Sequence, residues 1–191
     1  TSQNGFRQNL STSSSLATVV NFIAKKRAAG NYVIISALDS ANAFGAPPHS
    51  SLGKCLDKVF EGTALKLMKG SLERSATVAS NGIFSKIQQL KQYGVPQGSI
   101  CSPSVFCLYA AELRNALDPL DNDSALSVFA DDCILLTAGK TIEDVQEKTE
   151  NLYVTVGRKT KTLGLSMVPE KTAIIVTGKQ GCHLKDTTTY P

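Results

Sequence analysis

The sequence predicts an α+β fold in which helices pack on a sheet. In several segments apolar residues recur at helical spacing, while other segments are nearly continuous apolar runs of strand length. Glycine, proline and Asn-Gly positions separate the two kinds of segment. With 191 residues, the chain fits one domain or one and a half, and it is long enough to bury a core.

The first third of the chain is expected to hold two helices and one buried strand. Apolar residues between Leu16 and Ile23 share a helical face, so residues 14–29 should form a helix that ends at Gly30. Residues 32–38 form a nearly continuous apolar run, as a buried strand requires. A second helix is expected over residues 51–68.

A hairpin and a further helix are expected next. Residues 76–79 and 83–85 should pair, because Asn81-Gly82 between them accepts the positive φ angles of a tight turn. A helix is expected over residues 103–117, with Pro103 in its first turn, where the missing N–H costs nothing.

The last third should contain a hairpin, a long helix and a strand. Two short apolar runs, residues 126–129 and 133–136, favour a hairpin. Thr141 begins a capping sequence, and an apolar stripe continues from there to Gly164, which predicts a helix. Residues 173–177 should form a strand, followed by a polar tail.

Composition bounds the class of protein. Twenty Lys and Arg against sixteen Asp and Glu give a net charge of +4, which fits contact with nucleic-acid phosphates, although many soluble proteins carry as much. The five cysteines are odd in number and lack Cys-x-x-Cys spacing, which argues against a zinc site or a disulfide framework. We expect them to be reduced and mostly buried in a soluble, intracellular protein.

No membrane or secretion signal is expected. The chain has no run of about 18 apolar residues, so no transmembrane helix is predicted. Its first residues lack Met and the basic-then-apolar pattern of a signal peptide, so we expect the chain to begin inside a longer protein.

The pair Asp131-Asp132 is the first candidate for chemistry. It falls at the junction of the expected hairpin, between two apolar runs. Adjacent carboxylates repel each other, and a cation such as Mg²⁺, which prefers hard oxygen ligands, relieves that repulsion. Taken alone, however, most such pairs are solvated turn residues.

Two further features bear on this pair. Asp39 directly follows the buried strand over residues 32–38, where a partly desolvated carboxylate needs a partner or a metal, or else serves as a cap or turn residue. The segment Gly94-Val95-Pro96-Gln97-Gly98-Ser99 leads into the helix near Pro103. Its glycines allow close backbone approach to a ligand, and the alternative is a simple connector.

These features occur in the order found in reverse transcriptases, and the chain resembles the palm of that family, which implies an antiparallel sheet with helices packed on one face. The matching segments are Ala37-Leu38-Asp39-Ser40-Ala41-Asn42-Ala43-Phe44, residues 93–103 (Tyr-Gly-Val-Pro-Gln-Gly-Ser-Ile-Cys-Ser-Pro), Phe129-Ala130-Asp131-Asp132 and residues 164–172 (Gly-Leu-Ser-Met-Val-Pro-Glu-Lys-Thr). Upstream, Gln3-Asn4-Gly5-Phe6-Arg7 with Ser11-Thr12 resembles a fingers motif of non-LTR (LINE-like) retrotransposons. The resemblance extends from about residue 3 to residue 178.

The resemblance implies nucleotidyl transfer, in which a primer 3′-hydroxyl attacks the α-phosphate and pyrophosphate leaves. It implies two Mg²⁺ ions, for which Mn²⁺ can substitute, held by Asp39, the backbone carbonyl of Ser40, Asp131 and Asp132. Asp39 and Asp131 would bridge the ions, and Asp132 would support them. The implied partners are an RNA template, a DNA primer, deoxynucleotide triphosphates and the remainder of a larger polyprotein, without a membrane.

The resemblance also implies roles for residues outside the carboxylates. Phe44 would pack against the sugar and reject a 2′-hydroxyl, or else belong to the core. Gln97 and Gly98 would line the nucleotide and template side. Lys171 would neutralise or protonate the leaving pyrophosphate, the alternative being a surface charge, and Arg7 would reach template phosphate or the nucleotide.

His49 matches a histidine of the family, and structural packing is the role expected for it. Some positions depart from the family pattern. The family has Asp after the aromatic residue of its first motif, where this chain has Gly45, and Pro47-Pro48 is unusual there and is expected to distort the start of the next helix.

The expected organisation is a single partial reverse transcriptase domain over residues 1–191. Residues 1–30 and 70–92 would lie on the fingers side and residues 31–69 and 93–180 in the palm, without the thumb and the N-terminal fingers. Three interpretations stay open: a fragment of an active retrotransposon polymerase in the cytoplasm and nucleus, a decayed inactive copy, and a nucleic-acid-binding scaffold. An RNA-templated RNA polymerase is disfavoured, because its hairpin typically carries Gly-Asp-Asp.

Overall fold

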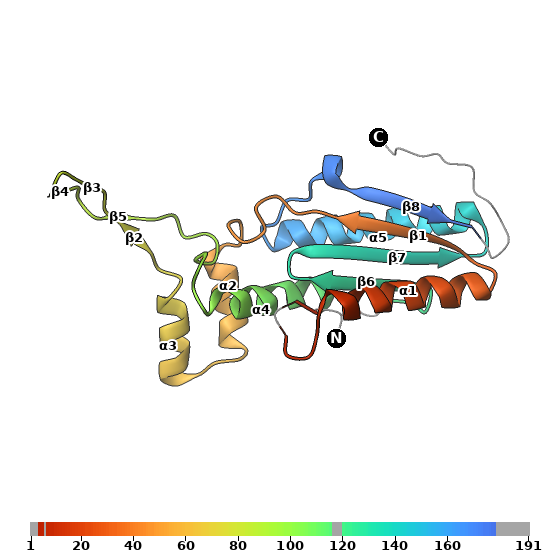
Figure 1. Ribbon diagram of the computed structural model, residues 1–191, viewed down its shortest axis with the longest axis horizontal. Coiled ribbons are helices and arrows are strands. Elements are labelled where there is room, and N and C mark those ends of the chain that lie inside the picture. The colour runs from red at the N-terminus through yellow and green to blue at the C-terminus, as the bar shows by residue number, and fades with distance from the viewer. Residues whose placement is uncertain (1–3, 6, 116–119, 179–191) are drawn as a thin grey trace.

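A four-stranded antiparallel sheet forms the centre of the molecule (Figure 1). The computed structural model describes residues 4, 5, 7–115 and 120–178. The strand order is β6 (Ser124–Phe129), β7 (Asp132–Gly139), β1 (Tyr32–Leu38) and β8 (Ala173–Thr177). The predicted strands over residues 32–38 and 173–177 are confirmed, and the predicted hairpin is present with longer strands than expected. The α+β fold class is therefore confirmed.

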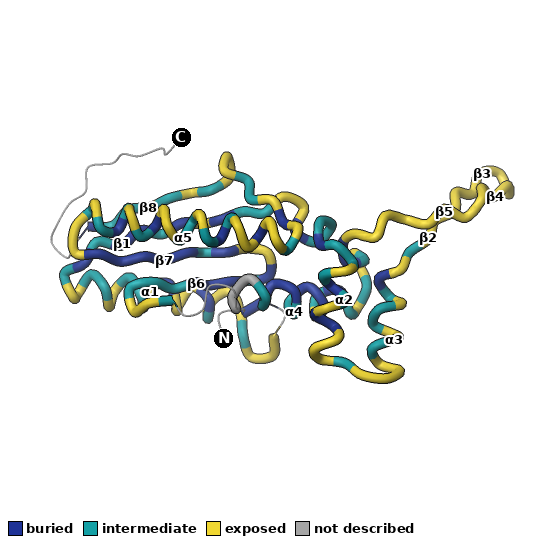
Figure 2. Tube along the Cα trace, turned by 180° about the vertical axis from the view of Figure 1, so that it is seen from behind, coloured by how far each residue is buried: buried dark blue, intermediate teal, exposed yellow. Residues whose placement is uncertain are grey.

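Helices lie against both faces of this sheet. Helix α5 (Ile142–Thr162) packs on one face, where Val156 joins Leu126 and Val128 in an apolar cluster. Helix α1 (Thr12–Ala28) is tied to the other face, because Ser15 Oγ lies 2.7 Å from Ser127 Oγ and successive strand residues point to opposite faces. Figures 1 and 2, seen from opposite sides, show the two helices on either side of the sheet. We expected the helices on one face, so the structure corrects this detail.

A second apolar core joins three helices beside the sheet. It lies between α2 (His49–Asp57) and α4 (Ser102–Asn115), with the fully buried Phe106 and Tyr109 at its centre. Helix α3 (Gly62–Gly70) packs against α2. The single helix expected over residues 51–68 is thus two helices, because α2 ends at Asp57 and the backbone is extended at Glu61 (φ −133°, ψ 165°), the N-cap of α3.

An extended arm projects from the end of α3 (Figures 1 and 2). It carries two small two-stranded sheets, which pair β2 (Ser75–Ala76) with β5 (Gln88–Gln89) and β3 (Ala79–Ser80) with β4 (Ile83–Phe84). The predicted turn is confirmed, since Asn81 and Gly82 both have positive φ. Every residue of these four strands is exposed, so the arm has no core of its own.

The helix ends agree with the capping signals. Ser11 caps α1 through the backbone N–H of Ser14, and Thr141 caps α5 through the N–H of Asp144, as the sequence predicted for α5. The end of the helix expected at residue 117 lies outside the described residues, as do Gln3, Phe6, Cys182 and the polar tail. None of the helices in the described part of the chain is long and apolar enough to cross a membrane.

The four cysteines among the described residues are free thiols. Cys55 and Cys133 are buried, whereas Cys101 and Cys107 are half-buried. The expectation of burial therefore holds for two of these four.

Candidate active site

The three candidate aspartates meet at one end of the central sheet. Strand β1 pairs with β7 in a register that sets Leu38 opposite Cys133. Asp39 follows Leu38 and Asp132 precedes Cys133, so the same antiparallel register places Asp39 across from Asp132. Asp131 lies beside them in the connection between β6 and β7. The strand order therefore gathers carboxylates from two distant segments.

A tight turn presents the Asp131-Asp132 pair. Phe129 pairs with Asp132, so Ala130 and Asp131 alone connect the two strands. Ala130 has a φ of 56°, in the left-handed region, which costs a non-glycine residue roughly 1–2 kcal/mol. Strain of this kind is typical of functional sites. Both aspartates are exposed at the tip of this turn.

The carboxylates influence one another electrostatically. Partial burial raises the pKa of Asp132 above its ordinary value, and the charges of Asp131 and Asp39 raise it further. Behind them, burial and the Asp132 charge raise the pKa of the Cys133 thiol to about 12, so this thiol stays neutral. The site is therefore a group of oxygen donors whose mutual repulsion a cation would relieve.

These donors fit a hard divalent cation by their chemistry, but they do not converge on one point. In the part of the chain that the structure describes, no three His, Cys, Asp or Glu side chains lie close enough together to hold a metal ion. Asp39 instead contacts a lysine. The fit is thus one of donor type and charge.

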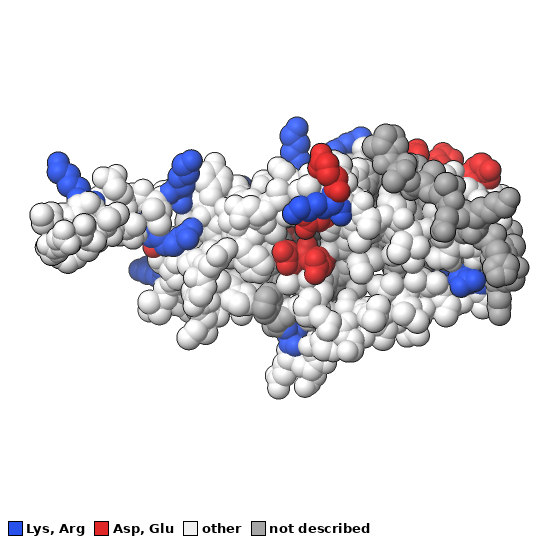
Figure 3. All heavy atoms as spheres, turned by 45° about the horizontal axis from the view of Figure 1, so that its top comes forward, with Lys and Arg blue, Asp and Glu red and all other residues white. Residues whose placement is uncertain are grey.

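Lys171 is brought to Asp39 by the segment before β8. Its Nζ lies 3.3 Å from Asp39 Oδ2. Lys171 belongs to the short 3-10 helix η1 (Pro169–Lys171), and the residue before this helix, Val168, donates its N–H to Asp39 C=O (3.0 Å). Figure 3, which draws one face of the molecule, shows acidic side chains in the middle of that face with basic side chains directly beside them. The lysine and aspartate side chains are 68% and 36% exposed, so the ion pair contributes only about 0–1 kcal/mol to stability.

The backbone carbonyl of Ser40 is directed away from its neighbouring strand. Ser40 stands opposite Met167, and the flanking hydrogen bonds run from Ala41 N–H to Ser166 C=O (2.8 Å) and from Val168 N–H to Asp39 C=O. In such a pair the N–H and C=O of the two opposed residues point away from each other. The Ser40 carbonyl is thus turned away from Met167.

Phe44 lies in contact with the second core. Its ring stacks on Phe106 of α4, with ring centroids 4.2 Å apart and an angle of 20° between the planes. The side chain is half-buried, so part of it remains accessible. The structure therefore gives Phe44 a packing role, which the sequence analysis had left open beside contact with a sugar.

Gln97 and Gly98 are exposed in the loop before α4. Gly98 has a φ of 85°, and the Ser102 hydroxyl donates a hydrogen bond to the Pro96 carbonyl across the loop. The Ser99 N–H also donates to Pro96 C=O, at 3.2 Å. The Ser99 bond closes a turn over residues 96–99, and Ser102, whose side chain ties the start of α4 to this turn, is a supporting residue that sequence patterns did not mark.

Arg7 lies on the N-terminal segment, which contacts strand β6 of the aspartate hairpin. Asn4 N–H donates to Val128 C=O at 2.8 Å, two residues before Ala130, and the Cys107 thiol donates to Gly5 C=O at 3.1 Å. These two bonds fix the segment between β6 and α4, and Arg7, two residues after Gly5, is exposed.

The proline pair does not distort the next helix as expected. Pro48 is the N-cap of α2, with φ −63° and ψ 138°, and Pro47 C=O accepts a hydrogen bond from Gly94 N–H at 2.7 Å. Both prolines precede the first helical residue, His49, where their missing N–H groups cost no helical bond. The departure from the family pattern is accommodated locally.

Comparison with known proteins places these features in a family. A family model described as reverse transcriptase (RNA-dependent DNA polymerase) matches residues 1–188. The RNA-directed DNA polymerase from mobile element jockey of Drosophila melanogaster is 30% identical over 144 residues, covering 73% of this chain and 16% of that protein. The probable RNA-directed DNA polymerase from transposon BS of the same species is 28% identical over 174 residues, covering 89% of this chain and 19% of that protein.

Solved structures share the fold. A telomerase from Candida tropicalis in complex with a fragment of telomeric RNA superposes with a TM-score of 0.70 and 15% identity, covering 98% of this chain and 32% of that one. A telomerase from Candida albicans gives a TM-score of 0.69 and 14% identity, covering 95% of this chain and 31% of that one. This chain spans 16–19% of the length of the curated relatives it matches.

Proposed function

Because this chain belongs to the reverse transcriptase (RNA-dependent DNA polymerase) family, we propose that it carries the polymerase centre of a non-LTR mobile element. The reaction is RNA-directed DNA synthesis, in which a primer 3′-hydroxyl attacks the α-phosphate of a deoxynucleotide triphosphate. The substrates are an RNA template, a DNA primer and deoxynucleotide triphosphates. The chain acts as part of a larger polyprotein, in the cytoplasm and the nucleus.

One observation carries this proposal: the pairing of β1 with β7 ends with Leu38 opposite Cys133, so the adjoining Asp39 and Asp132 lie at the same end of the sheet. Carboxylates from separate segments at one end of a sheet suit nucleotidyl transfer, because together they can hold two cations. The raised pKa of Asp132 supports such a grouping.

The metal ligands are assigned as Asp39, the Ser40 carbonyl, Asp131 and Asp132. All are hard oxygen donors of the kind that Mg²⁺ prefers, and Mn²⁺ is a suitable substitute. Two such ions, when bound, activate the attacking hydroxyl and stabilise the leaving oxygens. Asp39 and Asp131 would be the principal ligands and Asp132 would support them; Asp39 would then give up its contact with Lys171.

Lys171 then becomes available to the leaving group. Its ammonium lies 3.3 Å from Asp39 and is 68% exposed, so it can turn from the carboxylate toward a phosphate oxygen without leaving water. There it neutralises or protonates the departing pyrophosphate.

The nucleotide is held from several sides. Phe44, fixed by its stack on Phe106, presents its accessible part to the sugar and disfavours a 2′-hydroxyl. Gln97 and Gly98 line the nucleotide and template side from their exposed loop, and Arg7 reaches phosphate from the segment beside β6.

We assign the subdomains from the resemblance to reverse transcriptases. Residues 31–69 and 93–180 form the palm, which includes the whole central sheet. Residues 1–30 and 70–92 form elements on the fingers side, among them the exposed arm, although α1 within them packs on the palm sheet.

The test is primer extension by the natural polypeptide that contains these residues, on an RNA template with Mg²⁺ and the four deoxynucleotide triphosphates. We expect extension that stops when a chelator removes Mg²⁺ and resumes when Mg²⁺ is restored. A folded polypeptide that binds the primer-template but adds no nucleotide would contradict the proposal, and a decayed copy would behave in this way.

A further inference from the structure

Two segments far apart in the sequence, residues 44–49 and 92–95, are joined backbone to backbone. The first leads from Phe44 into helix α2, and the second leads from the arm into the Gln97 loop. Three hydrogen bonds connect them, from Val95 N–H to Phe44 C=O (2.8 Å), from Gly94 N–H to Pro47 C=O (2.7 Å) and from His49 N–H to Gln92 C=O (3.0 Å). We refer to residues 44–49 and 92–95 as the backbone clamp.

Glycine at position 94 allows the backbone clamp to close. Gly94 has a φ of +75°, and a Cβ on it would lie 2.7 Å from Gly45 Cα and 2.8 Å from Phe44 O. Val95, which follows, is 2% exposed and belongs to the second core. The two backbones are therefore in direct contact, and the second segment is anchored at its buried end.

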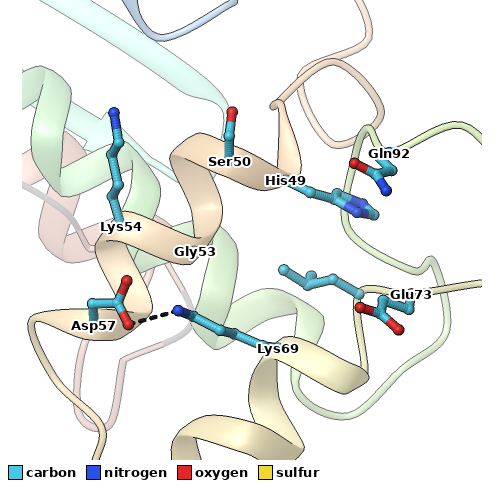
Figure 4. A pocket seen from close by; sticks show the side chains of 9 residues that line it. His49, Ser50, Gly53, Lys54, Asp57, Lys69, Glu73 and Gln92 are labelled. Atoms are coloured by element: carbon cyan, nitrogen blue, oxygen red, sulfur yellow. Dashed lines mark ion pairs between the residues drawn. The ribbon is translucent and has the colours of Figure 1, made fainter.

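Two side chains also hold the second segment of the backbone clamp: Arg74 Nη2 donates to Tyr93 C=O at 2.8 Å, and His49 acts at the next residue. His49 Nε2 lies 2.9 Å from Gly94 O, and because a carbonyl oxygen only accepts, Nε2 carries the hydrogen and donates. Figure 4 shows the His49 ring directed from the start of α2 toward the segment that carries Gln92. The ring thus holds the second segment at the residue where its backbone approaches the first.

The surroundings of His49 are open rather than packed. The ring borders a pocket whose other lining residues are mostly polar or charged: Ser50, Gly53, Lys54, Asp57, Lys69, Leu72, Glu73 and Gln92. His49 itself is half-buried, and it is not a member of either buried apolar cluster. Water can therefore reach Gly94 O when the ring is removed, so the fold should tolerate the loss while the loop becomes less restrained.

We propose that His49 is a positioning residue for nucleotide selection. By holding Gly94, His49 fixes the position of the loop that begins there relative to Phe44, on the other segment of the backbone clamp. Gln97 and Gly98 lie three and four residues further along this loop. This inference rests on the proposed function, in which Phe44 contacts the sugar and Gln97 the nucleotide. Its effect falls on nucleotide binding and on the discrimination between deoxynucleotides and ribonucleotides, and not on the chemical step at the aspartates.

The test is single-nucleotide primer extension by the natural polypeptide that contains these residues. For His49→Ala we expect the KM for the deoxynucleotide to rise about fivefold, the equivalent of one hydrogen bond, with kcat within about twofold of wild type. The ratio of kcat/KM for deoxynucleotide over ribonucleotide should fall. His49→Gln, whose amide nitrogen reaches about as far as Nε2, should restore both, and Ser50→Ala in the same pocket should match wild type.

A second readout needs no activity. Hydrogen exchange at the Gly94 and Val95 amides of the chain should speed up in His49→Ala and return toward wild type in His49→Gln. An active wild type whose His49→Ala variant keeps its KM and its sugar discrimination would overturn this inference alone. Equal losses in His49→Ala and His49→Gln would also overturn it, because the donor would then be irrelevant. A wild type without polymerase activity would instead overturn the proposed function and, with it, this role of His49.

Discussion

Replacing Gly94 by alanine places a methyl group where the structure has backbone. The new Cβ would lie 2.7 Å from Gly45 Cα, 2.8 Å from Phe44 O and 2.9 Å from Gly45 O, and none of these atoms can rotate away. Such overpacking costs about 1–3 kcal/mol. The φ of +75° adds roughly 1–2 kcal/mol for a residue with a Cβ. We therefore expect Gly94→Ala to lower the free energy of unfolding by about 2–5 kcal/mol.

The matched control is Gly98→Ala in the same loop. Gly98 has a similar φ of +85°, but a Cβ there meets nothing within 4 Å, so only the backbone cost of about 1–2 kcal/mol applies. Urea unfolding followed by circular dichroism measures both variants, since the chain has no Trp to report by fluorescence. Equal losses in the two variants would refute the close backbone contact between residues 94 and 45.

Two further outcomes are expected. Thr149 Oγ1 donates to Val145 C=O (2.7 Å) and accepts from Thr137 Oγ1 (2.6 Å). Thr149→Val leaves the buried Thr137 hydroxyl without its partner, so it should lower the free energy of unfolding by about 1–3 kcal/mol. Thr137→Val should lower it by less than about 1 kcal/mol. Similar values in urea titrations would contradict this asymmetry. The hydrogen bond from Lys26 lowers the pKa of Asp123 below its ordinary 3.8. The wild type should therefore be more stable than Asp123→Asn above pH 3.8, and this difference should disappear as the pH falls through the lower pKa of the folded state. A difference that instead grows toward acid pH in thermal melts would show the opposite sign.

Local patterns predicted the elements whose burial is simple. The strand over residues 32–38 lies between two others and is largely buried, so its apolar run gave the correct ends. Helix α5 was predicted from Thr141 and an apolar stripe, and the structure confirms both the cap and the buried Val145 and Val156. Such signals are local, because the residues that set the element also lie within it.

Predictions failed where tertiary context decides. The expected helix over residues 51–68 ends at Asp57, and the chain is extended at Glu61 before α3 begins, whereas Gly157 lies inside α5 without any break. Helix α1 covers the second face of the sheet through Ser15, a polar residue that the apolar stripe did not mark. The sequence alone does not say which of these alternatives each residue takes.

The site was predicted by resemblance and only partly by pattern. The Asp131-Asp132 pair is visible in the sequence, but its proximity to Asp39 depends on β1 lying beside β7. The contact of Lys171 with Asp39 depends on the 3-10 turn after Pro169. His49 was expected to pack and instead holds Gly94 O, a contact between residues 45 positions apart that no local periodicity signals.

The most direct test of the central claim is the rate of primer extension by Asp131→Asn in the natural polypeptide that contains this chain. The substitution keeps the shape of the side chain and removes its charge, and Glu150→Gln, at an exposed position on α5, is the matched control. A metal ligand should matter more than the outer contacts of a metal site, so we expect Asp131→Asn to slow extension by more than about 100-fold. Glu150→Gln should extend at the wild-type rate. Extension by Asp131→Asn at the wild-type rate would contradict the assignment of these aspartates as the polymerase centre.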